Sequence, residues 1–226
     1  MDVFVTGGSG YIGSRLIKSL LAEGNYNIRA LVRKGSELKI PPGCGLVFGD
    51  ALSSFSYQGK ILPGSVFIHL VGVAHPSPSK KDKFTKIDLV SVQEAAKAAV
   101  VAKASHFIYI SVSQYPSSIM KAYQLVRAEG ELILTRTGIR CSFIRPWYVL
   151  GPGHWWPIVL IPFYGLFSLF PLTREKVNQQ GLVTISQMIR MLVFAIKNPP
   201  ADKIVVYDVP AIKHFCSKKQ VVTEGR

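Results

Sequence analysis

Apolar positions recur along this chain in two alternating spacings, one typical of strands and the other of helices. Residues 2–6 form a short apolar run that predicts a strand, and from Ile12 to Leu21 apolar residues return every three or four positions, as on the buried face of a helix. Gly24 is the expected end of that helix. By the same patterns we expect further strands at 27–32, 45–49, 66–71, 106–110, 140–144 and 204–207, and helices at 84–103, 120–137 and 184–197.

This succession of strands and helices predicts an α/β fold, because each helix carries the chain back across the sheet and leaves the strands parallel. The run at 66–71 is apolar almost throughout, which is typical of a strand covered on both faces. We therefore expect a doubly wound parallel sheet with helices on both sides.

Three glycines stand between the first strand and the first helix, at positions 7, 10 and 13. Glycines at this spacing let the backbone approach a pyrophosphate, and the first N–H groups of the helix then point at it. A turn without a ligand is the alternative, but the flanking strand and helix give the motif the context that it needs. We expect a phosphate site at Gly7, Gly10, Tyr11, Ile12 and Gly13. The sequence thus predicts a dinucleotide-binding Rossmann domain at 1–150, a small substrate-side lobe at 151–212 and a basic tail at 213–226.

Composition narrows the class of protein further. With 48% hydrophobic and 18% charged residues, 226 residues suffice for one sizeable core. The net charge of +14 is spread along the chain without a nucleic-acid motif, which favours a solvated basic surface over a nucleic-acid site. Three cysteines without metal-like spacing favour a reduced cytoplasmic protein that holds no metal. The first strand begins at Asp2, so we expect no signal peptide.

The segment 155–172 is almost uncharged and rich in aromatic residues. Its length would just allow a membrane span, but prolines at 157, 162 and 171 interrupt it, so we expect short pieces. Three roles stay open: a wall of the substrate pocket, a homodimer contact, or an interfacial patch that brings a cytoplasmic protein to a membrane surface.

The residues after the second strand predict which dinucleotide binds. A carboxylate there accepts from the 2′-hydroxyl of NAD, whereas an arginine suits the 2′-phosphate of NADP. Arg33 and Lys34 occupy this position. Because a guanidinium can bind a phosphate through two parallel hydrogen bonds, we expect NADP(H) in preference to NAD(H); two surface cations are the alternative.

Asp50 ends the third predicted strand. Its carboxylate could accept from the adenine amine or cap a local turn, and both roles stay open. Ala51 and Val71 join it among the expected cofactor-binding residues.

Ser111, Tyr123 and Arg127 form the candidate catalytic set. Ser111 ends the fifth strand, at the sheet edge where ligands of such folds bind, and Tyr123 and Arg127 lie four residues apart on one helix face. A tyrosine exchanges a proton with a substrate oxygen if its pKa falls from about 10, and a neighbouring cation favours that fall. A core serine, a helix-face tyrosine and a surface arginine are the alternative.

These motifs together resemble the extended and atypical short-chain dehydrogenases/reductases. The resemblance rests on the loop at 6–13, Arg33, Asp50, and Ser111 followed by Tyr123-x-x-x-Arg127, and it covers residues 1 to about 210. It extends to the nucleoside-diphosphate-sugar epimerase branch. The helix from Tyr123 is also similar to the NmrA-like and Complex I 39-kDa-subunit-like branches, some of which bind NADP without turnover.

The resemblance implies that the segment 145–153, with Pro146 and Trp147, borders nicotinamide and substrate. His75, His154 and Trp155 are further substrate-side candidates.

In two positions the chain departs from the family pattern. Arg127 replaces the lysine of the family motif, and it keeps the charge without being able to lose a proton. Asp88 stands where many relatives carry an asparagine.

Two classes of function follow, and both are compatible with a third hypothesis, a peripheral membrane protein that handles an apolar substrate. The first is an NADP(H)-dependent oxidoreductase acting on a carbonyl or sugar-like small molecule, with Tyr123 as acid/base, Ser111 holding the oxygen, and Arg127 orienting ribose. The second is a non-catalytic NADP(H)-binding redox sensor or assembly subunit.

Overall fold

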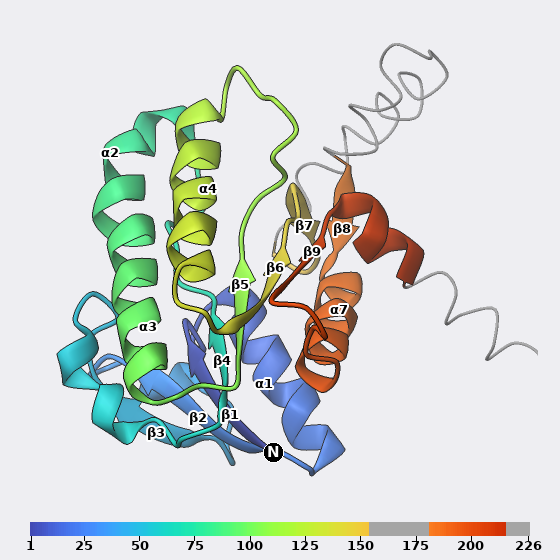
Figure 1. Cartoon of the computed structure of the whole chain (residues 1–226). Coiled ribbons are helices and arrows are strands. Elements are labelled where there is room, and N and C mark those ends of the chain that lie inside the picture. The colour runs from blue at the N-terminus through green and yellow to red at the C-terminus, as the bar shows by residue number, and fades with distance from the viewer. Residues whose placement is uncertain (154–180, 216–226) are drawn as a thin grey trace, which may run out of the picture.

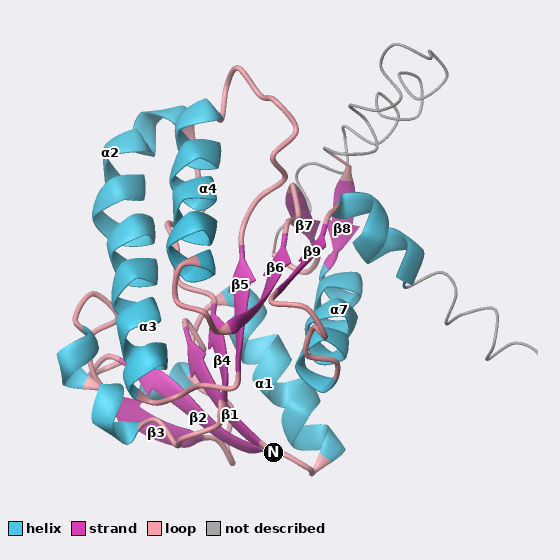
Figure 2. Ribbon diagram, in the orientation of Figure 1, coloured by secondary structure: helices cyan, strands magenta, loops and turns pink. Residues whose placement is uncertain are grey.

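The computed structural model describes residues 1–153 and 181–215, and its centre is a seven-stranded parallel sheet in the order β3-β2-β1-β4-β5-β6-β9 (Figures 1 and 2). The strands of this sheet are β1 (Asp2–Thr6), β2 (Asn27–Val32), β3 (Gly45–Phe48), β4 (Val66–His69), β5 (His106–Ile110), β6 (Arg140–Ile144) and β9 (Ile204–Tyr207). In register, Val5 lies between Ala30 of β2 and Ile68 of β4. The expected α/β doubly wound fold is confirmed.

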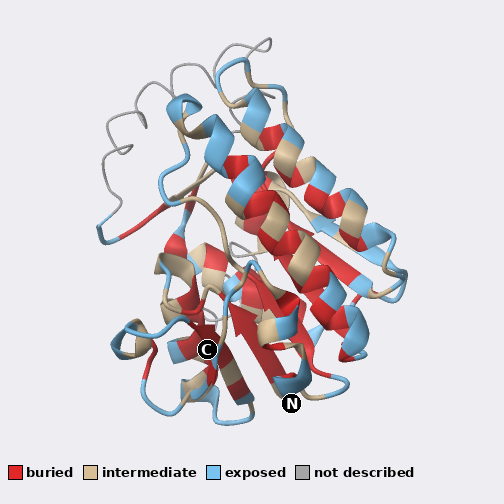
Figure 3. Ribbon diagram, turned by 90° about the vertical axis from the view of Figure 1, so that its left-hand side faces the viewer, coloured by how far each residue is buried: buried red, intermediate tan, exposed pale blue. Residues whose placement is uncertain are grey.

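Helices cover both faces of the sheet (Figure 1). One face carries α1 (Tyr11–Glu23) and α7 (Ile185–Lys197), and the other carries α3 (Val90–Val101) and α4 (Lys121–Thr135). Figure 3 shows largely buried strands and helices that alternate between buried and exposed residues, which is the banding that their apolar spacing predicts.

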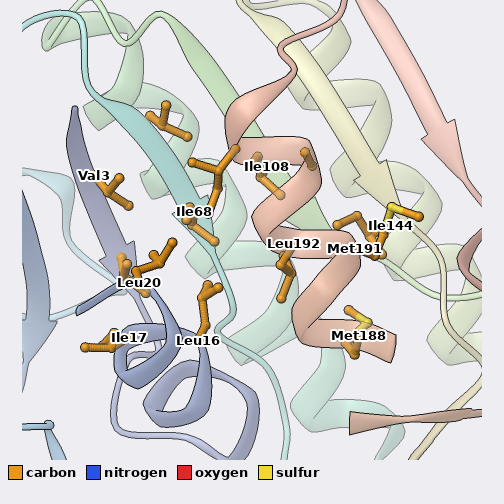
Figure 4. Packing of buried hydrophobic residues seen from close by; sticks show 14 of the residues in the cluster. Val3, Leu16, Ile17, Leu20, Ile68, Ile108, Ile144, Met188, Met191 and Leu192 are labelled. Atoms are coloured by element: carbon orange, nitrogen blue, oxygen red, sulfur yellow. The ribbon is translucent and has the colours of Figure 1, made fainter. Parts of the chain in front are cut away.

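Two apolar clusters hold the layers together, one on each face of the sheet. On the first face, Leu16 and Leu20 of α1 pack with Met188 and Leu192 of α7 over strand residues such as Ile68 (Figure 4). On the second face, aromatic residues of the strands pack under the alanine-rich α3. Small residues on α3 let this helix approach the sheet closely. The residues just before α3 contact α4, as the packing of Phe84 on Tyr123 shows.

Several elements differ from the expected ones. The helix expected at 84–103 begins earlier and is divided into α2 (Lys81–Lys83), a π-helix at Phe84–Leu89, and α3. Two short strands, β7 (Tyr148–Leu150) and β8 (Leu182–Thr184), pair in a small sheet that the sequence pattern did not predict, because three-residue strands carry too little periodicity. Residues 209–215 are helical, so the predicted tail from 213 begins inside a helix.

The predicted lobe at 151–212 contributes to the main body. β9 is an edge strand of the large sheet, and α7 packs against α1. Thr184 starts α7 with a capping box, in which its side chain accepts from the Gln187 N–H at 3.2 Å and the Gln187 side chain accepts from the Thr184 N–H. The boundary at residue 151 stays a prediction.

The strand order reverses at β1. Because β2 lies on one side of β1 and β4 on the other, the chain leaves the sheet in opposite directions there and a crevice opens above the carboxyl ends of the strands. The glycine loop and the residues after β4 and β5 all meet at this edge.

Candidate functional site

The glycine loop turns tightly from β1 into α1. Gly7 has a φ of +77°, and its carbonyl accepts from the Gly10 N–H at 3.0 Å. A side chain at Gly13 would collide with that carbonyl, and one at Gly7 would lie 2.8 Å from the Leu70 carbonyl carbon. Gly10 caps α1 without a side-chain hydrogen bond, so the first turn of the helix keeps N–H groups for an anion.

Two pockets meet at this loop. The first has a volume of about 350 Å³ and the second about 570 Å³. Four residues line both of them: Gly7, Gly10, Leu70 and Gly72. A single elongated ligand can therefore cross the glycine loop from one pocket to the other.

The first pocket contains the residues expected around adenosine, so we name it the adenosine-side pocket. Arg33 after β2, Asp50 and Ala51 after β3, and Val71 after β4 all line it. Lys34 does not line either pocket. One oxygen of Asp50 accepts from the Leu52 N–H at 3.0 Å, so this carboxylate caps its own turn and keeps a second oxygen for a ligand.

The second pocket contains the candidate reaction residues, and we name it the reaction-side pocket. Ser111 and Tyr123 line it, together with Tyr11, Ile12 and Gly13 of the first helix and with Pro146 and Trp147 after β6. The backbone N–H of Ser111 donates to Ile144 O at 2.8 Å, which fixes the serine at the sheet edge. Ser111 is 3% exposed, and its hydroxyl has no hydrogen-bond partner among the residues that the structure describes. A buried hydroxyl without a partner is costly, so it marks a place for a ligand atom.

Tyr123 is held by a ring and by an arginine. Its ring packs on Phe84 with centroids 4.9 Å apart, and its hydroxyl oxygen accepts from Arg127 Nε at 3.1 Å. Burial raises the pKa of Tyr123 above its ordinary value, and the charge of Arg127 opposes this without reversing it. The expected fall of this pKa is therefore wrong: the phenol stays protonated near neutral pH, because the same burial that packs the ring removes water from the hydroxyl.

Arg127 lies behind the pocket wall. It is 5% exposed and lines neither pocket. Its Nη2 forms an ion pair with Asp88 Oδ1 at 2.6 Å, and its Nη1 donates to the hydroxyl of Tyr109 at 3.3 Å. Burial lowers the pKa of Arg127, but the two tyrosines and Asp88 raise it overall, so the guanidinium stays charged.

Comparison with known proteins identifies the family. Residues 3–132 match the model of the NAD dependent epimerase/dehydratase family. The chain belongs to that family. A UDP-glucose 4-epimerase from Vibrio cholerae is 24% identical over 231 residues, covering 88% of this chain and 68% of the relative. A sugar epimerase from Bacillus subtilis, YhfK, whose activity is uncharacterised, is 27% identical over 65% of this chain and 71% of its own length.

Solved structures share the fold of this epimerase/dehydratase chain. MoeE5 in complex with UDP-glucose and NAD superposes with a TM-score of 0.69 at 19% identity, covering 97% of this chain and 82% of that one. The UDP-glucuronic acid 4-epimerase from Bacillus cereus, in complex with NAD, gives 0.65 at 17% identity, covering 92% and 78%.

The observed site fits the nicotinamide dinucleotide that family membership implies. Side chains at Gly7 and Gly13 would collide with backbone, so both glycines are needed for the tight turn that exposes the first N–H groups of α1. The Ser111 hydroxyl, which is buried and has no partner in the described part of the chain, lies on the reaction-side pocket. In the part of the chain that the structure describes, no cluster of His, Cys, Asp and Glu could hold a metal ion, and no helix combines the length and apolarity of a membrane span.

The substrate-side candidates are partly placed. His75 and Trp147 line the reaction-side pocket, whereas His154 and Trp155 fall outside the described residues. His75 has a φ of +50°, unusual for a residue with a side chain. Lys80 Nζ donates to the carbonyls of Ala74 and His75 at 2.7 and 2.8 Å, which holds this turn beside the pocket.

Three contributors to the site were not expected from the sequence. Asp88 pairs with Arg127, Tyr109 offers it a hydroxyl, and Gly72 lines both pockets in contact with the pair. Gly130, a glycine inside a predicted helix, is a signal in the sequence for the Tyr109 contact. A side chain at this position would lie 2.7 Å from the Tyr109 hydroxyl. A helix-interior glycine costs about 1 kcal/mol relative to alanine, so it indicates close packing at that point.

Proposed function

We propose that this chain is an oxidoreductase that binds NADP(H) and transfers hydride to or from a carbonyl or sugar carbon of a small molecule. The observation that carries the proposal is the meeting of the unpartnered, buried Ser111 hydroxyl and the Tyr123 phenol on one pocket. That pocket shares four lining residues with the adenosine-side pocket. Two hydrogen-bond donors beside the far end of a dinucleotide groove suit the oxygen of a reacting carbonyl.

Each residue has a defined task in this reaction. A reduced dinucleotide bound across the glycine loop would supply hydride to the substrate carbon. The Ser111 hydroxyl donates a hydrogen bond to the substrate oxygen and holds it in place. Tyr123 gives its phenolic proton to that oxygen as negative charge develops, so carbonyl, hydride and proton together yield the alcohol. Because burial raises the pKa of Tyr123, the phenol keeps its proton near neutral pH and carries it when a substrate oxygen binds.

The preference for NADP(H) rests on Arg33. It lines the adenosine-side pocket with Ser36, whereas the acid of that pocket, Asp50, follows β3 rather than β2. A guanidinium after β2 can bind a 2′-phosphate, and Arg33 stands where a carboxylate would favour NAD. The sugar-nucleotide names of the relatives support a sugar-like or carbonyl substrate.

A non-catalytic NADP(H)-binding module is the second candidate. It is favoured by the placement of Arg127, which donates its hydrogen bonds to protein atoms behind the wall. In such a protein the reaction-side pocket would bind the nicotinamide without a second substrate.

NADPH oxidation with a panel of carbonyl compounds and sugar nucleotides separates the two. The reductase should oxidise NADPH with at least one compound, and Tyr123→Phe should lower kcat by about 100-fold or more, because the general acid is lost. Tyr207→Phe, a change at a partly buried tyrosine on β9 that lines neither pocket, is the control. Equal rates for wild type and Tyr123→Phe would refute the mechanism, and binding without turnover of any compound would favour the second candidate.

A further inference from the structure

A short ladder of side chains joins the π-helix to α4 behind the reaction-side pocket. The π-helix carries Phe84 and Asp88, which are four residues apart, and α4 carries Tyr123 and Arg127 at the same spacing. Phe84 packs on the Tyr123 ring, and Asp88 pairs with the Arg127 guanidinium. π-Helical turns are rare and frequent at functional sites, because they shift side chains off the ordinary helical register.

Arg127 directs its hydrogen-bond donors to protein atoms. Nε donates to the Tyr123 hydroxyl, Nη2 to Asp88, and Nη1 to Ile110 O at 3.0 Å and to the Tyr109 hydroxyl. The bond from Nε occupies a lone pair of the Tyr123 oxygen. The proton of this phenol is therefore left to a different acceptor, and Tyr123 lines the reaction-side pocket.

Asp88 extends the ladder to the loop after β4. Its second oxygen accepts from the Val73 N–H at 3.0 Å, and Arg127 Nη1 approaches Val71 O at 3.5 Å. Between these contacts, a side chain at Gly72 would lie 2.9 Å from Asp88 Oδ1 and would collide with the guanidinium. The loop at 71–73 thus packs against the ion pair, and Gly72 lines both pockets.

We propose that Asp88 and Arg127 act as one positioning unit, which fixes the 71–73 loop where the two pockets meet and orients Tyr123 as a proton donor. The proposal rests on the proposed function for the Tyr123 part and on dinucleotide binding alone for the loop part. Both members of the unit are buried and lie outside the pocket walls, so neither is a catalytic residue. In this chain an acid and an arginine together take the place that the family motif gives to a single lysine.

A buried ion pair can also serve stability alone. A second ion pair, between Glu131 of α4 and Arg145 after β6, allows the two roles to be separated. Glu131 of α4 is 7% exposed and accepts from Arg145 Nε at 2.8 Å and from its Nη2, so this ion pair joins α4 to the residue after β6 rather than to the 71–73 loop. Asp88→Asn and Glu131→Gln each leave an arginine without its carboxylate, so both should lower thermal stability. A purely structural role predicts the same consequences for both variants.

NADPH titration of the full chain by fluorescence tests the loop part. Asp88→Asn should weaken NADPH binding by about tenfold, because a neutral amide holds Arg127 and the Val73 N–H less strongly than a carboxylate does, and Glu131→Gln should keep the wild-type Kd. The double variant Asp88→Asn/Arg127→Gln removes both charges and should recover thermal stability while binding stays weaker than in wild type, because the 71–73 loop has lost its carboxylate. If Asp88→Asn does not fold, the double variant and Arg127→Lys, which keeps the charge pair, provide the same comparison.

Turnover tests the Tyr123 part. Arg127→Lys should lower kcat more than it raises the KM for the carbonyl compound, because a point charge cannot hold Asp88 and Tyr123 together. Equal NADPH Kd values in wild type, Asp88→Asn and the double variant would overturn the proposal that Asp88 and Arg127 position the 71–73 loop. Absence of turnover in wild type would refute the proposed function but leave the binding comparison valid.

Discussion

The adenosine-side and reaction-side pockets are built from different kinds of groups. The adenosine side consists of backbone at the glycine loop and of single residues that follow β2 and β3. The reaction side depends on side chains that contact one another across long stretches of sequence, such as Asp88 and Arg127, 39 residues apart. One half is therefore local chain geometry and the other is tertiary packing. Substitutions should affect the two halves in different ways.

The largest expected effect concerns the glycine loop, where the two pockets meet. Gly13→Ala should weaken NADPH binding by about 100-fold, because its Cβ collides with Gly7 O and pushes the helix away from the phosphates. Gly59→Ala is the matched control, since a Cβ there meets nothing within 4 Å. Fluorescence titration measures both, and an unchanged Kd for Gly13→Ala would show that the glycine loop does not form the phosphate site.

A smaller effect concerns His69, which ends β4 one residue before Leu70, a residue that lines both pockets. This buried ring bonds to the Thr6 hydroxyl at 2.8 Å through Nδ1 and to Ser91 at 3.2 Å through Nε2. Burial, and then the charge of Arg127, lower the pKa of His69 from 6.5 to about 3. The unfolded chain thus binds the proton more readily, so stability is fully present above pH 6.5 and is lost as the pH falls toward 3.

Urea unfolding as a function of pH measures this loss. Between pH 6.5 and pH 4.5, His69 should account for roughly 2 kcal/mol of the fall in unfolding free energy, and His69→Gln should flatten the curve by that amount. His75→Gln, at an exposed histidine, serves as the control. If the unfolding free energy of wild type and of His69→Gln depended on pH in the same way, the folded protein would tolerate a charged imidazole at the end of β4.

The smallest effect concerns the choice of dinucleotide. Arg33→Ala should weaken NADPH binding by about tenfold and leave NADH binding unchanged, because in the proposed complex the guanidinium binds only the 2′-phosphate. Arg136→Ala, which removes an exposed cation at the end of α4, controls for net charge. An equal loss for both dinucleotides would assign Arg33 a structural role.

The same contrast explains how much could be predicted from the sequence. The glycine loop, Arg33, Asp50, Ser111 and Tyr123 follow strands or lie on a regular helix, so spacing alone placed them on the pockets. The fold was predictable for the same reason, since the apolar periodicity of each long element sets its buried face.

Partners across the fold were not predictable. The sequence gives Arg127 a position on the same helix face as Tyr123, but not its ion pair, because Asp88 reaches it from a π-helical turn that no apolar period marks. The direction of the Tyr123 pKa was also predicted wrongly, since a neighbouring cation is visible in the sequence and burial is not. Lys34 follows Arg33 in the chain yet lines neither pocket, because adjacent residues at a strand end point in different directions.

In the proposed complex, one dinucleotide spans both pockets with its nicotinamide beside Ser111 and Tyr123. A crystal structure of the full chain with NADP⁺ tests it most directly. The proposed function predicts the 2′-phosphate within hydrogen-bond distance of Arg33, and the nicotinamide ring in the reaction-side pocket next to the Tyr123 hydroxyl. Density that placed the nicotinamide outside that pocket, with Tyr123 out of its reach, would contradict it.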